Sequence, residues 1–141
     1  MFAVENVVPK SISKFIPAPF KGMKYITVAK GETKTITTLA RNVYPAKDEN
    51  FETLISKIDG SPILRKIMYV GFDDGTYTSF KTDIAVSQLE SIVNDDDETT
   101  KVWDLEAMNL VQKVKIIEVQ QTYGKGNNAK QYPVKAFEPI E

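Results

Sequence analysis

The stretch that decides the fold runs from residue 68 to residue 93 and reads MYVGFDDGTYTSFKTDIAVSQLESIV. An aromatic-rich hydrophobic run leads into Asp74-Gly75, a second aromatic run follows, and a helix-patterned stretch ends the segment. Asp-Gly between two such runs is typical of a tight hairpin, because glycine accepts the positive φ that the turn requires. The segment therefore predicts strands over 62–72 and 76–80, followed by a helix.

This helix is predicted over 82–93. Thr82 can cap its N-terminus, Asp83 in the first turn favours the helix dipole, and apolar side chains recur at helical spacing. Another helix is predicted over 48–59, with Gly60 placed to end it. Its apolar stripe consists of Phe51, Leu54, Ile55 and Ile58.

Strand patterns occupy both ends of the chain. Residues 23–29 and 33–41 are rich in β-branched and aromatic side chains and are separated by a turn at 30–32, which predicts a β-hairpin. Residues 110–123 and 130–137 predict a second, longer hairpin with a basic, glycine-containing tip at 124–128.

The resulting order is two strands, a helix, two strands, a helix and a long strand pair. This order predicts a mainly β protein with two helices, in the form of an OB-like (oligonucleotide-binding), partly open antiparallel β-barrel. An α+β antiparallel sheet is the alternative. The chain of 141 residues fits a single domain, 1–141. Residues 1–20 hold three of the seven prolines, which predicts an N-terminal arm without regular structure.

The chain contains neither cysteine nor histidine. Disulfides, thiolate nucleophiles and Ser–His or Cys–His catalysis are thereby excluded within it, together with most zinc sites. We therefore expect a protein that is not an enzyme and requires no cofactor. The acidic cluster at 95–98 lacks the ligand spacing and the glycine of an EF-hand loop, so we expect no metal site there.

The sequence also bears on location. No apolar run approaches the roughly 18–20 residues of a membrane span, and the first fifteen residues lack the pattern of a signal peptide. The absence of cysteine suits a reducing compartment. We expect a cytoplasmic protein without membrane association.

The net charge of −1 hides an asymmetry along the chain. Residues 1–47 carry eight basic and two acidic groups, a balance of +6, whereas residues 48–106 carry five basic and fourteen acidic groups, a balance of −9. Residues 107–141 return to +2, with five basic and three acidic groups. Local fields of this kind can attract a polyanion even when the net charge is close to zero.

The last predicted hairpin offers the clearest candidate binding residues. Alternation places Lys113, Lys115 and Tyr123 on one face of residues 110–123. The tip and the partner strand add Lys125, Lys130 and Tyr132. Lysines that follow phosphates beside rings that stack on bases are what sequence-independent binding of a single strand requires. The alternative is a structural hairpin with snorkelling lysines and a cross-strand tyrosine pair.

The decisive segment supplies a second candidate set. Tyr69 and Tyr77 are expected to form an exposed stacking platform near Lys66, because a tyrosine ring keeps a polar tip, whereas the phenylalanines are expected in the core. Trp103 is expected to plug the core, with base stacking as the alternative. The first predicted hairpin would extend the basic track with Lys24, Lys34 and Arg41.

The stretch from Tyr69 to Val93, with its Asp-Asp-Gly-Thr-Tyr turn and apolar-faced helix, resembles the small single-stranded DNA-binding proteins of bacteriophages. The terminal hairpin around Tyr123-Gly-Lys-Gly-Asn-Asn is similar to the long β-hairpin of that group. The resemblance implies an OB-fold barrel that serves DNA replication or recombination in the cytoplasm of the infected cell. It also implies single-stranded DNA as partner, besides replication or recombination proteins, and we expect a homo-oligomer, a dimer.

The functional hypothesis is therefore sequence-independent binding of single-stranded DNA without catalysis. Two alternatives stay open. One is a protein-interaction or virion structural module that docks through its N-terminal arm and exposed strand edges. The other is a small regulator that mimics nucleic acid with its acidic central segment.

Overall fold

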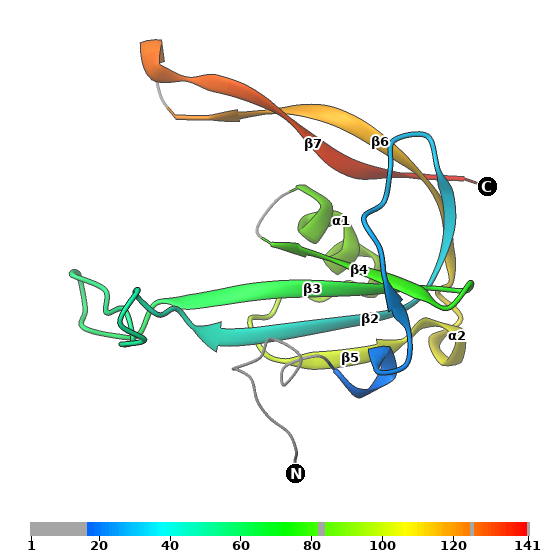
Figure 1. The fold of residues 1–141 in the computed structure, drawn as a ribbon, viewed down its shortest axis with the longest axis horizontal. Helices are drawn as coiled ribbons and strands as arrows, with labels where there is room; N and C mark the ends of the chain where they lie inside the picture. Colours follow the sequence, from blue (N-terminus) through cyan, green and yellow to red (C-terminus); the bar gives the residue numbers. More distant parts are fainter. Residues whose placement is uncertain (1–16, 82–83, 125, 141) are drawn as a thin grey trace.

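The computed structural model describes residues 17–81, 84–124 and 126–140. Its strands form an open, strongly curled half-barrel with two helices, consistent with an OB-like partly open barrel, so the predicted fold class is confirmed (Figure 1). In chain order the elements are the 3₁₀ helix η2 (Ala18–Phe20), β1 (Lys24–Tyr25), β2 (Thr33–Pro45), β3 (Leu64–Phe72), β4 (Thr76–Lys81), α1 (Ile84–Val93), β5 (Lys101–Asp104), α2 (Leu105–Met108), β6 (Gln112–Tyr123), the 3₁₀ helix η3 (Gly126–Asn128) and β7 (Lys130–Pro139).

The strands follow one another across the sheet in the order β1-β4-β3-β2-β6-β7. The β3–β4 and β6–β7 pairs are two of the three predicted antiparallel hairpins. The turn between β3 and β4 has the predicted glycine, Gly75, at a φ of 82°. The side chain of Asp74 accepts a hydrogen bond of 3.1 Å from the Thr76 amide, a usual length for such a bond.

β2 is the strand around which the sheet curls. One edge pairs with β3, while the other pairs first with β6, over 33–36, and then with β5, over 38–41. The register with β3 shifts between Ile36 and Thr38, and such a bulge bends a strand and increases its twist. The β6–β7 hairpin consequently leaves the plane of β3 and β4 and lies over α1 (Figure 1).

The main hydrophobic core lies between this hairpin and strands β2 to β4, with α1 against it. Leu39, Met68 and Val70 point into it from the sheet, because alternate residues of a strand share a face. α1 contributes Ala85 and Leu89, both fully buried. Trp103 of β5 also packs in this core with 8% of its surface exposed, so its expected place as a core plug is confirmed.

The side chain of Gln88 ties α1 to β7. Its Nε2 atom donates to the carbonyl oxygen of Phe137 at 2.8 Å, and its Oε1 atom accepts from the Phe137 amide, also at 2.8 Å. One glutamine thus satisfies both backbone groups of a strand residue.

The opposite face of β2 to β4 carries a smaller cluster, which is built on Ala40, Tyr69 and Tyr77 and covered by Phe20. The phenylalanine ring lies so close to Gly71 that a Cβ atom there would approach it to 2.8 Å. Part of the predicted irregular arm is therefore an ordered cover. Residues 1–16 of that arm, and the predicted cap of α1 at 82–83, lie outside the described residues.

The predicted hairpin of residues 23–29 with 33–41 is wrong. β1 pairs in parallel with β4, with Lys24 opposite Thr76 and Tyr25 opposite Tyr77. The following segment crosses to β6, where the Gly31 amide donates to the Ile116 carbonyl at 2.8 Å. An alternating pattern identifies a strand but not its partner. Here β1 pairs with the open edge of β4 and not with residues 33–41.

The predicted helix over 48–59 is also wrong, because the described residues there form hydrogen-bonded turns. Asp48 does not begin a helix; its side chain accepts from the amides of Asn50 and Glu52 at 2.8 and 3.0 Å. Phe51 adopts a left-handed φ of 63°, which no helix accommodates. Apolar residues at helical spacing stabilise a helix only where they pack against another part of the protein, and here most of them are exposed to solvent.

Candidate nucleic-acid interface

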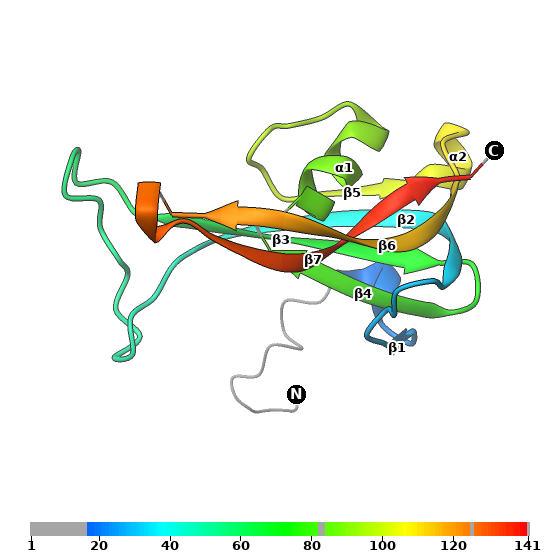
Figure 2. The same ribbon diagram turned by 90° about the horizontal axis from the view of Figure 1, so that it is seen from above.

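The β6–β7 hairpin has one face in the core and one directed away from it. Val114 and Ile116 are 1% exposed and pack in the core, so the odd-numbered residues of β6 point outward. The register pairs Gln121 with Tyr132 and Tyr123 with Lys130, which places the even-numbered residues of β7 on the same side. We call this side the outer hairpin face (Figure 2).

Three exposed lysines lie on the outer hairpin face, namely Lys113, Lys115 and Lys130. Tyr132 shares the face and is 45% exposed. Glu138, opposite Lys115, is an acidic residue on the same face. From Lys113 to Tyr123 the strand advances about 33 Å at roughly 3.3 Å per residue, enough to follow several nucleotides. The alternation predicted from the sequence is thus confirmed for these residues, whereas Lys125 and the side chain of Tyr123 lie outside the described part.

Gln121 adds a polar group to this face that the sequence did not single out. Its Oε1 atom is buried and, among the described side chains, lacks a hydrogen-bond partner. A buried acceptor without a donor costs about 1–3 kcal/mol, and because this atom has almost no accessible surface, a ligand would reach it only after the side chain moved. Alternation places Gln121 between Lys115 and Tyr123, and that is the signal that could have found it.

Arg41 does not belong to a basic surface track, and this expectation is corrected. Its side chain is fully buried, with Nη1 at 3.0 Å from Glu90 and Nη2 at 3.3 Å from Asp95. The guanidinium also lies 5.1 Å from the ring centroid of Trp103. Two residues after the buried Leu39, Arg41 has the register of a core residue, and a buried arginine requires acidic partners.

Neighbouring cations complete this ion-pair cluster. Lys66 lies 2.9 Å from Glu90, so its charge is paired and it is not a free phosphate ligand. Lys101 lies 2.8 Å from Asp95. The hydrogen bond from Lys101, followed by those from the Asp97 amide and from Arg41, lowers the pKa of Asp95 to about 2.

Lys34 is likewise paired. Its ammonium group lies 2.8 Å from Asp74 in the β3–β4 turn, and only 13% of its side chain is exposed. This hydrogen bond, with a second from Thr76, lowers the pKa of Asp74 to about 2. Of the basic residues expected in the first hairpin, Lys24 alone is exposed, and it lies on β1 away from the outer hairpin face.

Tyr69 and Tyr77 do not form an exposed platform, and this expectation is also corrected. They are 4% and 6% exposed, because the ring of Phe20 packs on them with centroid distances of 5.8 and 5.3 Å. Burial raises the pKa of both tyrosines. The exposed ring at this edge is instead Tyr25, 52% exposed and 5.3 Å from Tyr77.

A pocket of about 470 Å³ opens on the face of β2 to β4 that lies away from the core. We call it the Tyr44 pocket. It is lined by Asn42, Val43, Tyr44, Ile67, Tyr69, Lys81 and Thr100. Most of these side chains are apolar or aromatic, and Lys81 is the charged one. The core lies between the Tyr44 pocket and the outer hairpin face, so the two surfaces point in different directions.

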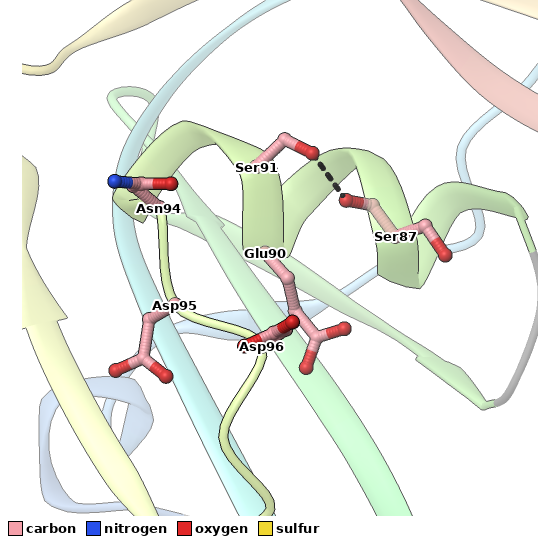
Figure 3. A pocket seen from close by; sticks show the side chains of 6 residues that line it. All are labelled: Ser87, Glu90, Ser91, Asn94, Asp95 and Asp96. Carbon is pink, nitrogen blue, oxygen red and sulfur yellow. Dashed lines mark hydrogen bonds between the residues drawn. The ribbon is translucent and has the colours of Figure 1, made fainter.

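A second pocket, of about 310 Å³, lies at the end of α1 (Figure 3). It is lined by Ser87, Glu90, Ser91, Asn94, Asp95 and Asp96. Its acidic character repels phosphate, and Glu90 and Asp95 already pair with the buried arginine. Within the described ranges, no group of three or more acidic side chains is arranged to hold a metal ion.

Comparison with known proteins adds no relative: no family model, curated protein or solved structure matches this chain. Among the helices described, none is long and apolar enough to cross a membrane. The half-barrel and the geometry of its outer hairpin face are therefore the basis for a functional assignment.

Proposed function

We propose that this protein binds single-stranded DNA without sequence preference and without catalysis, in phage DNA replication or recombination. The observation that carries the proposal is the outer hairpin face, where Lys130 and the half-exposed ring of Tyr132 lie toward the tip and Lys113 and Lys115 are exposed at the other end of β6. Lysines spaced along a strand can neutralise successive phosphates, and an aromatic ring can stack on a base of any identity.

The fold supports this choice. In OB-folds the loop between the last two barrel strands borders the nucleic acid. In this chain the corresponding loop is the tip between β6 and β7, next to Lys130 and Tyr132.

The test is the titration of a fluorescently labelled oligo-dT with the protein, followed by anisotropy at several salt concentrations. Tight binding that weakens with salt, and that exceeds binding to a duplex of equal length, is expected. Lys113→Ala/Lys115→Ala should weaken it and reduce the slope of log affinity against log salt by about 1.4, because each phosphate contact contributes about 0.7 on a single strand.

A matched control removes two lysines elsewhere. Lys57 is exposed in the β2–β3 loop, and Lys135 lies opposite Glu118 on the other side of the hairpin. Lys57→Ala/Lys135→Ala gives the same net charge and should leave the salt slope unchanged. Equal slopes for the two double variants would contradict the assignment to the outer hairpin face.

A protein-interaction or virion structural module is the second candidate. The observation that favours it is the β2–β3 loop, where Phe51 and Ile58 are 83% and 96% exposed. Absence of oligo-dT binding even at low salt, together with concentration-dependent assembly, would select this function instead.

A further inference from the structure

The loop of residues 46–63 between β2 and β3 extends beyond the end of the sheet (Figure 1). Its backbone is ordered by hydrogen bonds: the Leu54 amide donates to the Ala46 carbonyl, and the Ile63 amide donates to the Leu54 carbonyl, both at 2.9 Å. These bonds divide the loop into two lobes, 47–53 and 55–62. We call the whole segment the apolar loop.

Each lobe presents a large apolar side chain to solvent. Phe51 is 83% exposed at a left-handed φ of 63°, a conformation that is unfavourable for a bulky residue. The first lobe holds it there through the bond from its own amide to the Asp48 carbonyl at 3.0 Å. Ile58, in the second lobe, is 96% exposed.

Hydrogen bonds also order the second lobe. The Ser56 amide donates to the Ser61 carbonyl at 2.8 Å, and the side chain of Asp59 accepts from the Ser61 amide at 3.0 Å. Ordered turns that hold isoleucine and phenylalanine in water are typical of a binding surface, since such exposure gives the isolated chain no stability.

The same chain carries a cavity suited to these side chains. The Tyr44 pocket, with its volume of about 470 Å³, has Val43, Tyr44 and Ile67 in its wall. The side chain of Lys81 makes the pocket basic, and Arg65, the strand neighbour of Tyr44, adds a second exposed cation beside it.

The charges of loop and pocket are complementary. The apolar loop carries four acidic residues, Asp48, Glu49, Glu52 and Asp59, against Lys47 and Lys57, a balance of −2. An acidic loop repels the phosphates of nucleic acid and is attracted by Lys81 and Arg65. The apolar loop is therefore better suited to a protein surface than to DNA, and the pocket offers that surface.

We propose that the apolar loop of one copy of this chain docks in the Tyr44 pocket of a second copy, with Ile58 and Phe51 as its apolar anchors. The pocket residues Tyr44 and Ile67 lie only a few positions from the two ends of the loop, so loop and pocket occupy the same end of the sheet. A two-fold arrangement then brings each loop to the pocket of the other copy. The outer hairpin face stays outside this contact, so the inference goes beyond the proposed function and does not rest on it.

The test measures the mass of the full-length protein against concentration by sedimentation equilibrium. The wild-type protein is expected to form a dimer, and Ile58→Asp or Phe51→Asp should raise the dimer dissociation constant by about tenfold or more. Met108→Asp is the control, since Met108 is 42% exposed on α2, at the other end of β2. A monomer at every concentration, or dimers that survive both loop variants, would overturn the proposal.

Charge reversal identifies the docking pair. Lys81→Glu in the pocket and Glu49→Lys/Glu52→Lys in the loop should each weaken the dimer, because like charges then meet. Mixing the two variants should restore a heterodimer, in which both contacts again join opposite charges. If Lys81→Glu lowers oligo-dT affinity and leaves the mass unchanged, the pocket belongs to a nucleic-acid site and the proposal is wrong.

Discussion

The two long hairpins of this protein start from similar sequences and end as different surfaces. β3 and β4 alternate tyrosines with basic and aliphatic residues, and so do β6 and β7. In the first hairpin, Phe20 covers Tyr69 and Tyr77, and Glu90 pairs with Lys66. In the second, the lysines and Tyr132 remain exposed.

The difference lies in what packs on each hairpin. A distant segment reaches the outer side of β3–β4, because Gly71 leaves space for the phenylalanine ring. On the β6–β7 hairpin, α1 packs on the inner side, whereas Lys113, Lys115, Lys130 and Tyr132 on the outer side remain exposed. An aromatic and basic strand pattern is therefore a candidate site only where no other part of the chain covers it.

The largest expected effect is on stability, in Arg41→Ala. This substitution leaves Glu90 and Asp95 without their buried partner, and loss of one member of a buried ion pair typically costs about 3–5 kcal/mol. Urea unfolding should show this loss, whereas the salt slope of oligo-dT binding should not change. If the folded variant showed a reduced salt slope of oligo-dT binding, Arg41 would belong to the binding surface after all.

Phe20→Ala should turn the first hairpin into a surface more like the second. Loss of the buried ring should lower the free energy of unfolding by about 3 kcal/mol. Burial is the largest cause of the raised pKa of Tyr69, so that pKa should fall toward the ordinary value of 10.0. Absorbance titration of the tyrosines measures this fall, and an unchanged titration would mean that Phe20 is not the cover.

Tyr132→Ala probes the exposed hairpin with a smaller effect. A stacked base contributes about 1–3 kcal/mol, so oligo-dT affinity should fall by roughly tenfold while stability changes little. Tyr132→Phe keeps the ring and should keep the affinity. If both variants bind as the wild-type protein does, Tyr132 is not a stacking residue.

The smallest effect concerns pH. The folded pKa of Asp74 is about 2, below its ordinary value of 3.8, chiefly because of the hydrogen bond from Lys34. The resulting stability is complete above about pH 4 and is lost as the pH falls through about 2. Asp74→Asn should therefore remove a small acid-dependent step between these values, measured by comparing unfolding curves of variant and wild type at several acidic pH values. Because this carboxylate is 45% exposed, the step is expected to be minor.

The sequence predicted the elements whose signals are local. The Asp-Gly turn, the stripe of α1 and the alternation of β6 each depend on neighbouring residues, and all three have the expected form. The helix expected over 48–59 failed because periodicity does not reveal whether a packing surface exists.

In the candidate site, too, only the residues with a local signal could be predicted. Lys113, Lys115, Lys130 and Tyr132 follow from the period of one strand pair. The burial of Arg41, Tyr69 and Tyr77 depends on segments that are distant in sequence, namely the end of α1 and the turn at Phe20. For Arg41 a local signal was present, since it shares the register of Leu39.

The two hydrogen bonds between Gln88 and Phe137 join α1 to the open edge of β7. At this point the side-chain amide of Gln88 takes the place of a neighbouring strand. Along the same open edge, β7 carries Pro133 and Pro139, which offer no N–H group to an incoming strand. These prolines interrupt the row of N–H groups along that edge, which disfavours pairing with strands of other molecules. The proposed binding of single-stranded DNA on this part of the molecule therefore relies on side chains.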